Sequence, residues 1–145
     1  MININSGAVI FDDHLSIDSQ TQFSQMEDIP GAKVSASVAG RAQLSLGAHT
    51  VEGESWGVGV VFIQTKLSQI WLQCLSADGV DTTAWSLENE KIRKATHDVV
   101  VKRLCSSIGS AVQTTSSLVY KFPWGKVSSV LDIRGVQALI LVEYL

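Results

Sequence analysis

The stretch Trp56–Cys74, WGVGVVFIQTKLSQIWLQC, decides the fold class. Its apolar residues alternate with a period of two, which is the side-chain period of a β-strand. One face of the two expected strands carries the apolar residues Trp56, Val58, Val60, Phe62, Ile70, Leu72 and Cys74. We expect a hairpin here, with its connection at QTKLSQ (64–69).

Two glycines, Gly57 and Gly59, fall on the opposite face of the first strand. A strand face without side chains allows a bulky group, such as a helix or an aromatic ring, to approach the backbone. The run GVGVVF has the first two glycines of a dinucleotide fingerprint, but it lacks the third and lies inside a strand. The sequence therefore predicts close packing at these glycines and no phosphate-binding loop.

Shorter signals precede this stretch. Segments 7–11 and 14–17 predict two short strands around an Asp-Asp pair that favours a tight turn. Residues 21–26 predict a helical turn that ends at Ile29-Pro30-Gly31. The alternation in 32–54 predicts two further strands.

One segment, Trp85–Gly109, predicts a long helix. Candidate caps lie in 81–86, acidic residues lie in the first turn, and basic residues lie near the end, as the helix dipole favours. Two apolar stripes follow: His97, Val100, Val101, Leu104 and Ile108 on one side, and Ile92, Ala95 and Val99 on another. We expect the sheet to cover one stripe and another segment or a partner to cover the other.

Three closing strands are predicted at 118–122, 126–131 and 136–144, with a turn at 132–135. Strands, then one helix, then strands indicate an α+β fold with a largely antiparallel multi-stranded sheet and one long helix. A chain of 145 residues is the size of one ordinary domain, so residues 1–145 are expected to form a single domain.

Targeting signals are not evident in the sequence. No run of about 18 apolar residues occurs, and the N-terminus lacks the basic start and apolar block of a secretion signal. We therefore expect a cytoplasmic protein without a membrane partner. Cys74 and Cys105 lack metal-type spacing, and we expect them to be buried, reduced packing residues.

No recognisable catalytic set is present. The histidines belong to no paired metal motif, the cysteines are single, and no serine has the flanking glycines of a nucleophile elbow. We therefore predict no enzyme activity, no cofactor and no metal. If the protein were an enzyme, its candidate catalytic residues would be His97, Asp132 and Arg134. If these residues are structural, we expect His97 to bond a backbone carbonyl and Asp132 to pair with Arg134 across a turn.

Charge is distributed unevenly along the chain. Residues 1–85 hold nine acidic and three basic side chains, a net charge of −6, while residues 86–145 hold five acidic and eight basic, a net charge of +3. Such a distribution argues against nucleic-acid binding through the N-terminal half, and it leaves two alternatives open: a positively charged partner or an ordinary solvated acidic face.

Three segments together resemble a known group of proteins. They are WGVGVVFIQTKLSQIWLQC, the helix with ENEKIRKATHDVVVKRLCSSIG, and YKFPWGKVSSVLDIRGVQALILVEY. In this order they resemble small bacterial toxin-immunity proteins, including immunity proteins of contact-dependent growth inhibition systems. The resemblance covers about residues 54–144, and its most specific element is the closing YxFxWGKVxSVxDxRG block. It implies a cytoplasmic protein that binds one toxin domain, commonly a nuclease, and blocks it without catalysis.

An acidic surface can steer and plug the positive groove of a nuclease. The expected partner-binding residues are the carboxylates before residue 55, namely Asp12, Asp13, Asp18, Glu27, Asp28, Glu52 and Glu54. The alternative is a structural or self-assembling subunit that uses the double-striped helix and exposed strand edges. Trp56 and Trp124 either close the two ends of the core or leave one ring exposed as an interface anchor. The oligomeric state stays open.

Overall fold

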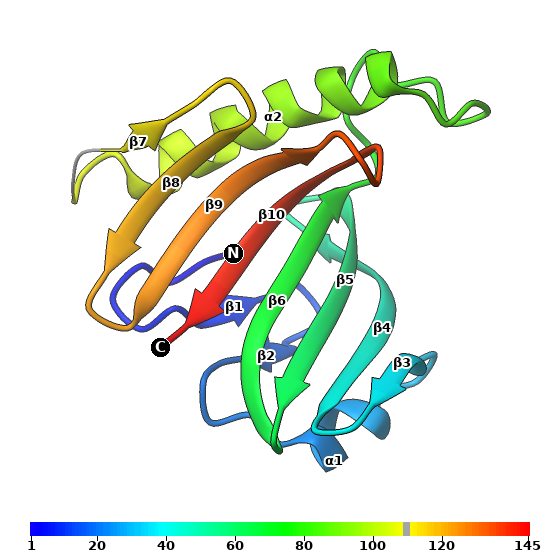
Figure 1. The fold of residues 1–145 in the computed structure, drawn as a ribbon, viewed down its shortest axis with the longest axis vertical. Coiled ribbons are helices and arrows are strands. Elements are labelled where there is room, and N and C mark those ends of the chain that lie inside the picture. Colours follow the sequence, from blue (N-terminus) through cyan, green and yellow to red (C-terminus); the bar gives the residue numbers. More distant parts are fainter. Residues whose placement is uncertain (109–110) are drawn as a thin grey trace.

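The computed structural model describes residues 1–108 and 111–145. These residues form an eight-stranded antiparallel sheet in the order β3-β4-β5-β6-β10-β9-β8-β7 (Figure 1). The strands are β3 (Lys33–Val38), β4 (Arg41–Val51), β5 (Glu54–Ile63), β6 (Lys66–Cys74), β7 (Val112–Gln113), β8 (Ser117–Phe122), β9 (Gly125–Asp132) and β10 (Gln137–Tyr144). With the long helix α2 (Leu87–Cys105), this confirms the α+β class.

One face of the sheet is covered and the other is open. Phe23 of α1 (Phe23–Glu27) packs edge-on against Phe62, with ring centroids 5.5 Å apart, and His97 of α2 stacks on Trp56 at 5.7 Å. Phe62 and Trp56 lie on the same face of β5, so both helices pack on that inner face. The predicted N-terminal hairpin, β1 (Val9–Ile10) with β2 (Ser16–Ile17), contributes to the same core. Figure 1 shows no described helix over the outer face.

The hairpin turns differ from the sequence prediction in length. Only Gln64 and Thr65 connect β5 to β6, and both adopt positive φ angles of 49° and 69°. Two residues of positive φ form the tight turn whose twist matches paired strands. The predicted connection over 64–69 is therefore wrong beyond Thr65. Strand β7, only two residues long, was not predicted.

Helix α2 begins at Leu87, two residues after the predicted start at Trp85, and its N-cap, Ser86, lies within the predicted cap range of 81–86. Ser86 Oγ accepts a hydrogen bond from the Asn89 backbone N–H at 3.2 Å, which satisfies one of the free donors of the first turn. The helix ends at Cys105, earlier than expected, and the predicted terminal Gly109 lies outside the described residues.

The two apolar stripes of α2 have different environments. In the first stripe, His97, Val100 and Val101 are buried and Leu104 is half-buried, but Ile108 lies beyond the helix end and is exposed. The second stripe, Ile92, Ala95 and Val99, is exposed and is covered by no described segment. The predicted sheet contact of the first stripe is confirmed, whereas coverage of the second stripe by a partner stays a prediction.

Gly59 is crowded as expected. A Cβ atom at this position would overlap the indole ring of Trp71, its cross-strand neighbour on β6. At Gly57 the nearest atom to such a Cβ would be Leu75 Cδ2 at an ordinary 3.6 Å. The approach of an aromatic ring to the strand backbone is thus confirmed at Gly59.

Side chains of the closing strands attach the N-terminal segment to the sheet. Trp124 Nε1–H donates to the Ile4 carbonyl at 2.7 Å, and Tyr144 O–H donates to the Gly7 carbonyl at 2.8 Å. Trp124 also stacks on Phe122 with centroids 5.1 Å apart. Trp56 is fully buried and Trp124 is partly buried, so both tryptophans belong to the core.

Candidate binding surfaces

Four of the seven predicted carboxylates gather at the β4–β5 turn. Asp12 lies close enough to the turn that its Oδ1 accepts from the backbone N–H of Glu52 at 3.1 Å. Asp13 Oδ2 lies 3.0 Å from His49 Nδ1 on β4, and this hydrogen bond lowers the pKa of the Asp13 carboxyl. Glu52 lies in the turn and Glu54 is the first residue of β5, and both are exposed. All four residues are exposed, but the carboxylates of Asp12 and Asp13 already make hydrogen bonds within the fold.

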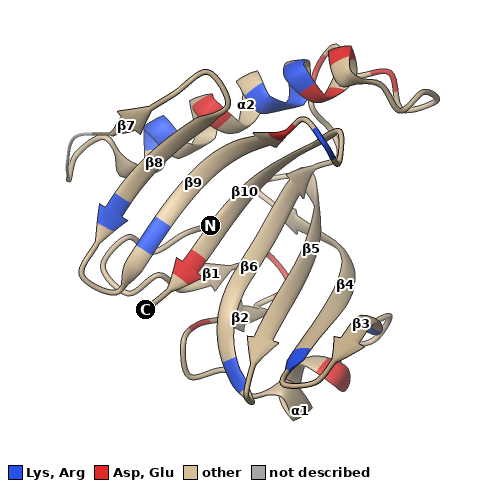
Figure 2. Cartoon of the chain, viewed as in Figure 1, with Lys and Arg blue, Asp and Glu red and all other residues tan. Residues whose placement is uncertain are grey.

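The other three carboxylates lie elsewhere. Glu27 and Asp28 lie at the C-terminal end of α1, and Phe23 of this helix packs near the beginning of β4. The 11 residues of β4 therefore separate these two carboxylates from the β4–β5 turn by roughly 30 Å. Asp18 is half-buried and uses Oδ1 to accept from the Gln20 N–H at 2.8 Å. Figure 2 shows α1 and its acidic residue at the far end of the long strands. The predicted set is thus not one continuous patch.

A groove lies between the β4–β5 turn and α2. Its volume is about 300 Å³, and it is lined by Glu52, Glu54, Thr96, Val99, Val100 and Arg103, which we call the acidic groove. Val99 of the second helix stripe is 67% exposed at its wall. Arg103 Nη1 lies 3.7 Å from Glu52 Oε2, a long pair between two exposed side chains that contributes little stability. Glu54 makes no ion pair with any other described residue.

A second feature is the separation of β6 from β10. The two strands pair from Gln69–Glu143 to Leu72–Ile140, and the same register would place Gln73 opposite Leu139 and then Cys74 opposite Ala138. Instead, side chains of α2 bind the backbone groups of these two residues. The ladder is therefore opened at one end by the helix.

Three side chains of α2 bond the backbone groups that the separated ends of β6 and β10 leave without a strand partner. Glu90 Oε2 accepts from the Ala138 N–H at 2.8 Å, and Arg93 Nε–H donates to the Cys74 carbonyl at 2.9 Å. Glu90 and Arg93 also form an ion pair with each other, and Glu90 is 3% exposed. Their spacing of three residues, followed by His97 four residues later, places all three on one face of the helix. We call this set the polar wedge.

His97 completes the polar wedge. Its Nε2 accepts a hydrogen bond from the Cys74 N–H at 3.0 Å, so the ring is neutral with its proton on Nδ1. Burial, with a further contribution from the Arg93 charge, lowers the pKa of His97 from 6.5 to about 3. The expected structural histidine thus bonds a backbone N–H and not a backbone carbonyl.

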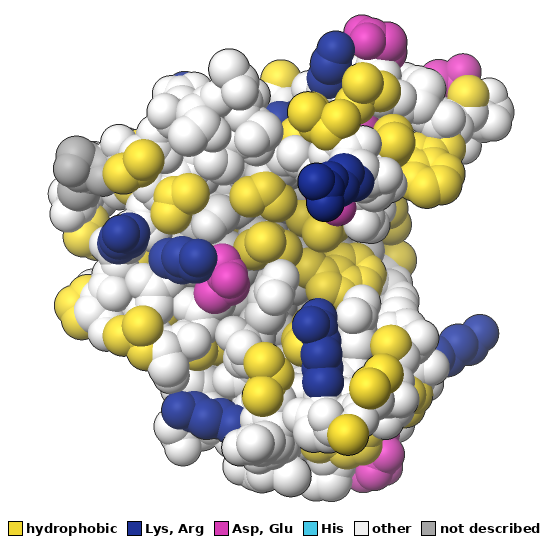
Figure 3. All heavy atoms as spheres, in the orientation of Figure 1, with side chains coloured by type: hydrophobic (Ala, Val, Ile, Leu, Met, Phe, Trp, Pro, Cys, Tyr) yellow, Lys and Arg dark blue, Asp and Glu magenta, His cyan; other side chains and the backbone are white. Residues whose placement is uncertain are grey.

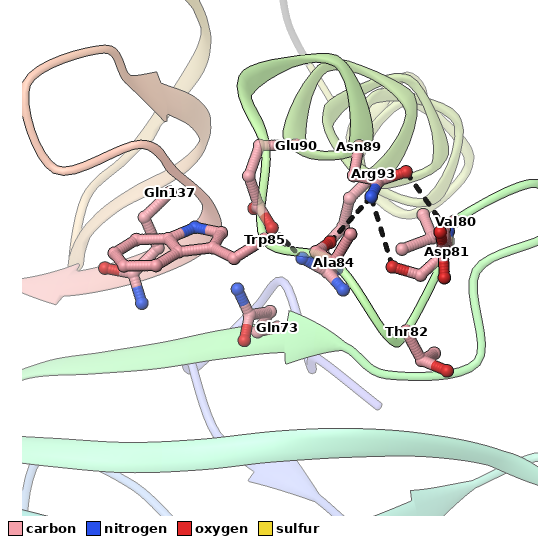
Figure 4. Close-up of a pocket in the computed structure, with 10 residues that line it drawn as sticks. All are labelled: Gln73, Val80, Asp81, Thr82, Ala84, Trp85, Asn89, Glu90, Arg93 and Gln137. Carbon is pink, nitrogen blue, oxygen red and sulfur yellow. Dashed lines mark hydrogen bonds and ion pairs between the residues drawn. The ribbon is translucent and has the colours of Figure 1, made fainter.

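The opened ladder borders a cleft of about 350 Å³ (Figure 4). The residues that line it are Gln73, Val80, Asp81, Thr82, Ala84, Trp85, Asn89, Glu90, Arg93 and Gln137, and we call it the tryptophan cleft. Trp85 is 76% exposed, yet its Nε1–H donates to the Val136 carbonyl at 2.6 Å. Figure 4 shows the indole beside Gln137, with Gln73 below it on β6.

The enzyme candidates are not assembled in one site. His97 is fully buried against β5 and β6, whereas Asp132 and Arg134 are exposed at the turn after β9. Asp132 Oδ1 accepts from the Arg134 backbone N–H at 3.0 Å. The predicted side-chain pair is therefore replaced by a turn hydrogen bond, in which the Asp132 carboxylate holds the backbone of the turn.

Both cysteines lie in the core as free thiols. Cys74 and Cys105 are buried and free, as predicted, and burial raises the pKa of both, that of Cys105 to about 11. Within residues 1–108 and 111–145, no group of three or more His, Cys, Asp or Glu side chains could hold a metal ion. In the same ranges, no helix has the length and apolar character needed to cross a membrane.

Sequence reasoning missed the tryptophan cleft and the polar wedge. The sequence predicts only that Trp85 lies at the helix start, and nothing in the pattern there distinguishes an exposed ring from a buried one. The wedge did leave a signal, because Glu90 and Arg93 share the helix face of His97, which otherwise carries the apolar stripe.

Comparison of the chain with models of known protein families, with curated proteins and with solved structures gave no match.

Proposed function

We propose that this protein is an immunity protein that binds a cognate bacterial toxin domain and blocks its working groove. The toxin domain is a basic protein, of the nuclease class that the sequence resemblance implies. The observation that carries the proposal is the acidic groove, where two accessible carboxylates, Glu52 and Glu54, lie beside the exposed Val99.

The composition of the acidic groove suits a protein partner. Protein interfaces combine an apolar centre with a polar rim, and complementary charge raises the rate of association. Val99 supplies apolar area, while Glu52 and Glu54 supply charge at the rim. The weak Arg103–Glu52 pair leaves that carboxylate available for exchange with a partner's cation.

The outer sheet face is less suited to a basic partner. Among its side chains, Lys121 and Lys126 lie in one cross-strand row with Glu143, and Lys126 Nζ pairs with Glu143 Oε2 at 3.2 Å. Figure 3 shows more basic than acidic side chains on this face. Attraction of a basic domain therefore favours the acidic groove, which the β4–β5 turn and α2 form.

Self-assembly through β3 is the second candidate. All six residues of this edge strand are exposed, and Val34 and Val38 present apolar side chains there. A β-bulge between Val34 and Ala36 interrupts the regular edge, which disfavours pairing with a second copy. Light scattering at high protein concentration distinguishes the two, because self-assembly predicts a dimer or larger species and the immunity proposal requires none.

Mixing the purified protein with the toxin domain encoded beside it tests the proposal. We expect a stable one-to-one complex on size exclusion and loss of the toxin's activity in the presence of the protein. A toxin domain that keeps full activity and elutes separately would refute the proposed function.

A further inference from the structure

We propose that the tryptophan cleft is a binding site for an uncharged sugar ring. The cleft lies where β6 ends and β10 begins, which is the end of this strand pair away from the C-terminus. It shares no lining residue with the acidic groove. The inference is therefore independent of toxin binding. Its volume of about 350 Å³ falls near the lower end of small-molecule sites, roughly 300–1,000 Å³.

The indole of Trp85 provides a rigid stacking surface. An exposed aromatic ring with a fixed orientation can pack against the apolar C–H face of a sugar without losing much side-chain freedom. The hydrogen bond to the Val136 carbonyl fixes this ring although three-quarters of the residue is exposed. A tryptophan held in place only to cover the core would instead be buried.

The remaining lining is polar and has unused hydrogen-bonding groups. Gln73 on β6 and Gln137 on β10 bring two side-chain amides to opposite strands of the split (Figure 4). Arg93 has five N–H donors, and only those on Nε and Nη1 make the bonds described above, so others are left for a ligand. The Arg93 side chain is 11% exposed. Amides and a guanidinium can bind hydroxyl oxygens, and the amide carbonyls can accept from hydroxyl groups.

The rim opposite Trp85 is preorganised. Asn89 Nδ2–H donates to the carbonyls of Asp81 at 3.1 Å and Ala84 at 2.7 Å, and its Oδ1 accepts from the Asp81 N–H at 3.1 Å. These three bonds hold the loop before α2 against the helix. A ligand therefore does not have to order this side of the cleft.

The charges of the cleft select against ionic ligands. The Arg93 cation is already paired with the buried Glu90 carboxylate, and Asp81 adds a second carboxylate. An anion would meet these carboxylates, while a cation would meet the guanidinium. An apolar ligand would displace the water molecules that bond the polar groups of the cleft and would offer no hydrogen bonds in their place, which costs binding free energy. A neutral ring with several hydroxyl groups and one apolar face meets none of these penalties.

Titration of ¹⁵N-labelled protein tests the inference. The probes are glucose, galactose, N-acetylglucosamine, lactose and cellobiose, each raised to about 100 mM. We expect at least one to shift the Trp85 indole N–H and the Gln73 and Gln137 side-chain amide signals saturably, with half-saturation on the order of 1 mM. Trp85→Ala and Gln73→Ala should each weaken binding about tenfold or more. Ile133→Ala, an exposed residue of the neighbouring turn outside the cleft, should leave binding unchanged.

Two results would overturn the inference. One is the absence of a saturable shift with all five sugars. The other is a shift that persists unchanged in both Trp85→Ala and Gln73→Ala. Both side chains lie outside the buried core, and the spread of backbone amide signals reports whether each variant remains folded.

Discussion

Single residues set the protonation and packing of the core. His97 sits in a site without solvent, where it must accept the Cys74 N–H, and protonation of Nε2 would remove that acceptor. Its pKa is about 3 in the fold against 6.5 for an unperturbed histidine. The unfolded chain therefore binds more protons than the folded chain between these two values.

Stability should consequently depend on pH through His97. Its contribution is fully present above pH 6.5 and is lost as the pH falls toward 3, by up to about 1.4 kcal/mol per pH unit. We expect this residue to account for about 2 kcal/mol of lost unfolding free energy between pH 7 and pH 5. Urea unfolding of the wild type and of His97→Gln at both pH values measures the difference. An equal loss in the two proteins would show that His97 is not the responsible group.

Gly59 and Gly57 form a matched pair for testing the contact with Trp71. Gly59→Ala should lower the unfolding free energy by about 1–3 kcal/mol, because the new methyl group overlaps the indole and forces it to move. Gly57→Ala places its methyl group in ordinary contact with Leu75, so its effect should be clearly smaller. Chemical denaturation measures both, and the account of this contact fails if Gly57→Ala proves the more damaging change.

At the scale of elements, α2 both covers the sheet and opens it. Glu90, Arg93 and His97 take over the backbone hydrogen bonds that Cys74 and Ala138 would otherwise exchange. A buried ion pair is costly to break from one side, since the remaining charge has no compensation. The polar wedge therefore links the position of α2 to the separation of β6 from β10, because the same three side chains hold both.

Arg93→Met should destabilise the protein by about 3–5 kcal/mol, because it leaves the Glu90 carboxylate buried without its cation. The double variant Glu90→Gln/Arg93→Met removes both charges while Gln retains an acceptor for the Ala138 N–H. We expect the double variant to be more stable than Arg93→Met alone. Denaturation curves of the two single variants and the double variant give the coupling energy, and additive effects would contradict a coupled pair.

Predictability from the sequence also differs between elements. The alternation of Trp56–Cys74 and the candidate caps in 81–86 are local signals, so the two strands were predicted and the helix start was predicted to within two residues. The Gln64–Thr65 turn lacks the Asn-Gly signal of its turn type, and its length was therefore wrong. The contact of Asp12 with the β4–β5 turn joins residues 40 positions apart, which no local pattern encodes.

At the scale of the whole molecule, the distribution of carboxylates changes the expected binding surface. The sequence showed a net charge of −6 over residues 1–85, but the fold divides the seven predicted carboxylates between different places. Asp12 and Asp13 are used by the fold itself. Of the predicted set, Glu52 and Glu54 are the ones that line a groove beside an exposed apolar stripe.

The affinity of paired charge-reversal variants for the toxin domain tests the proposed function most directly. One variant is Glu52→Lys/Glu54→Lys in the acidic groove, and its control is Glu27→Lys/Asp28→Lys, which changes the net charge equally at the far end of the strands. Calorimetric titration at low salt should show binding weakened at least 100-fold by the first variant and less than threefold by the second. Equal weakening by the two, or none by the first, would contradict recognition through the acidic groove.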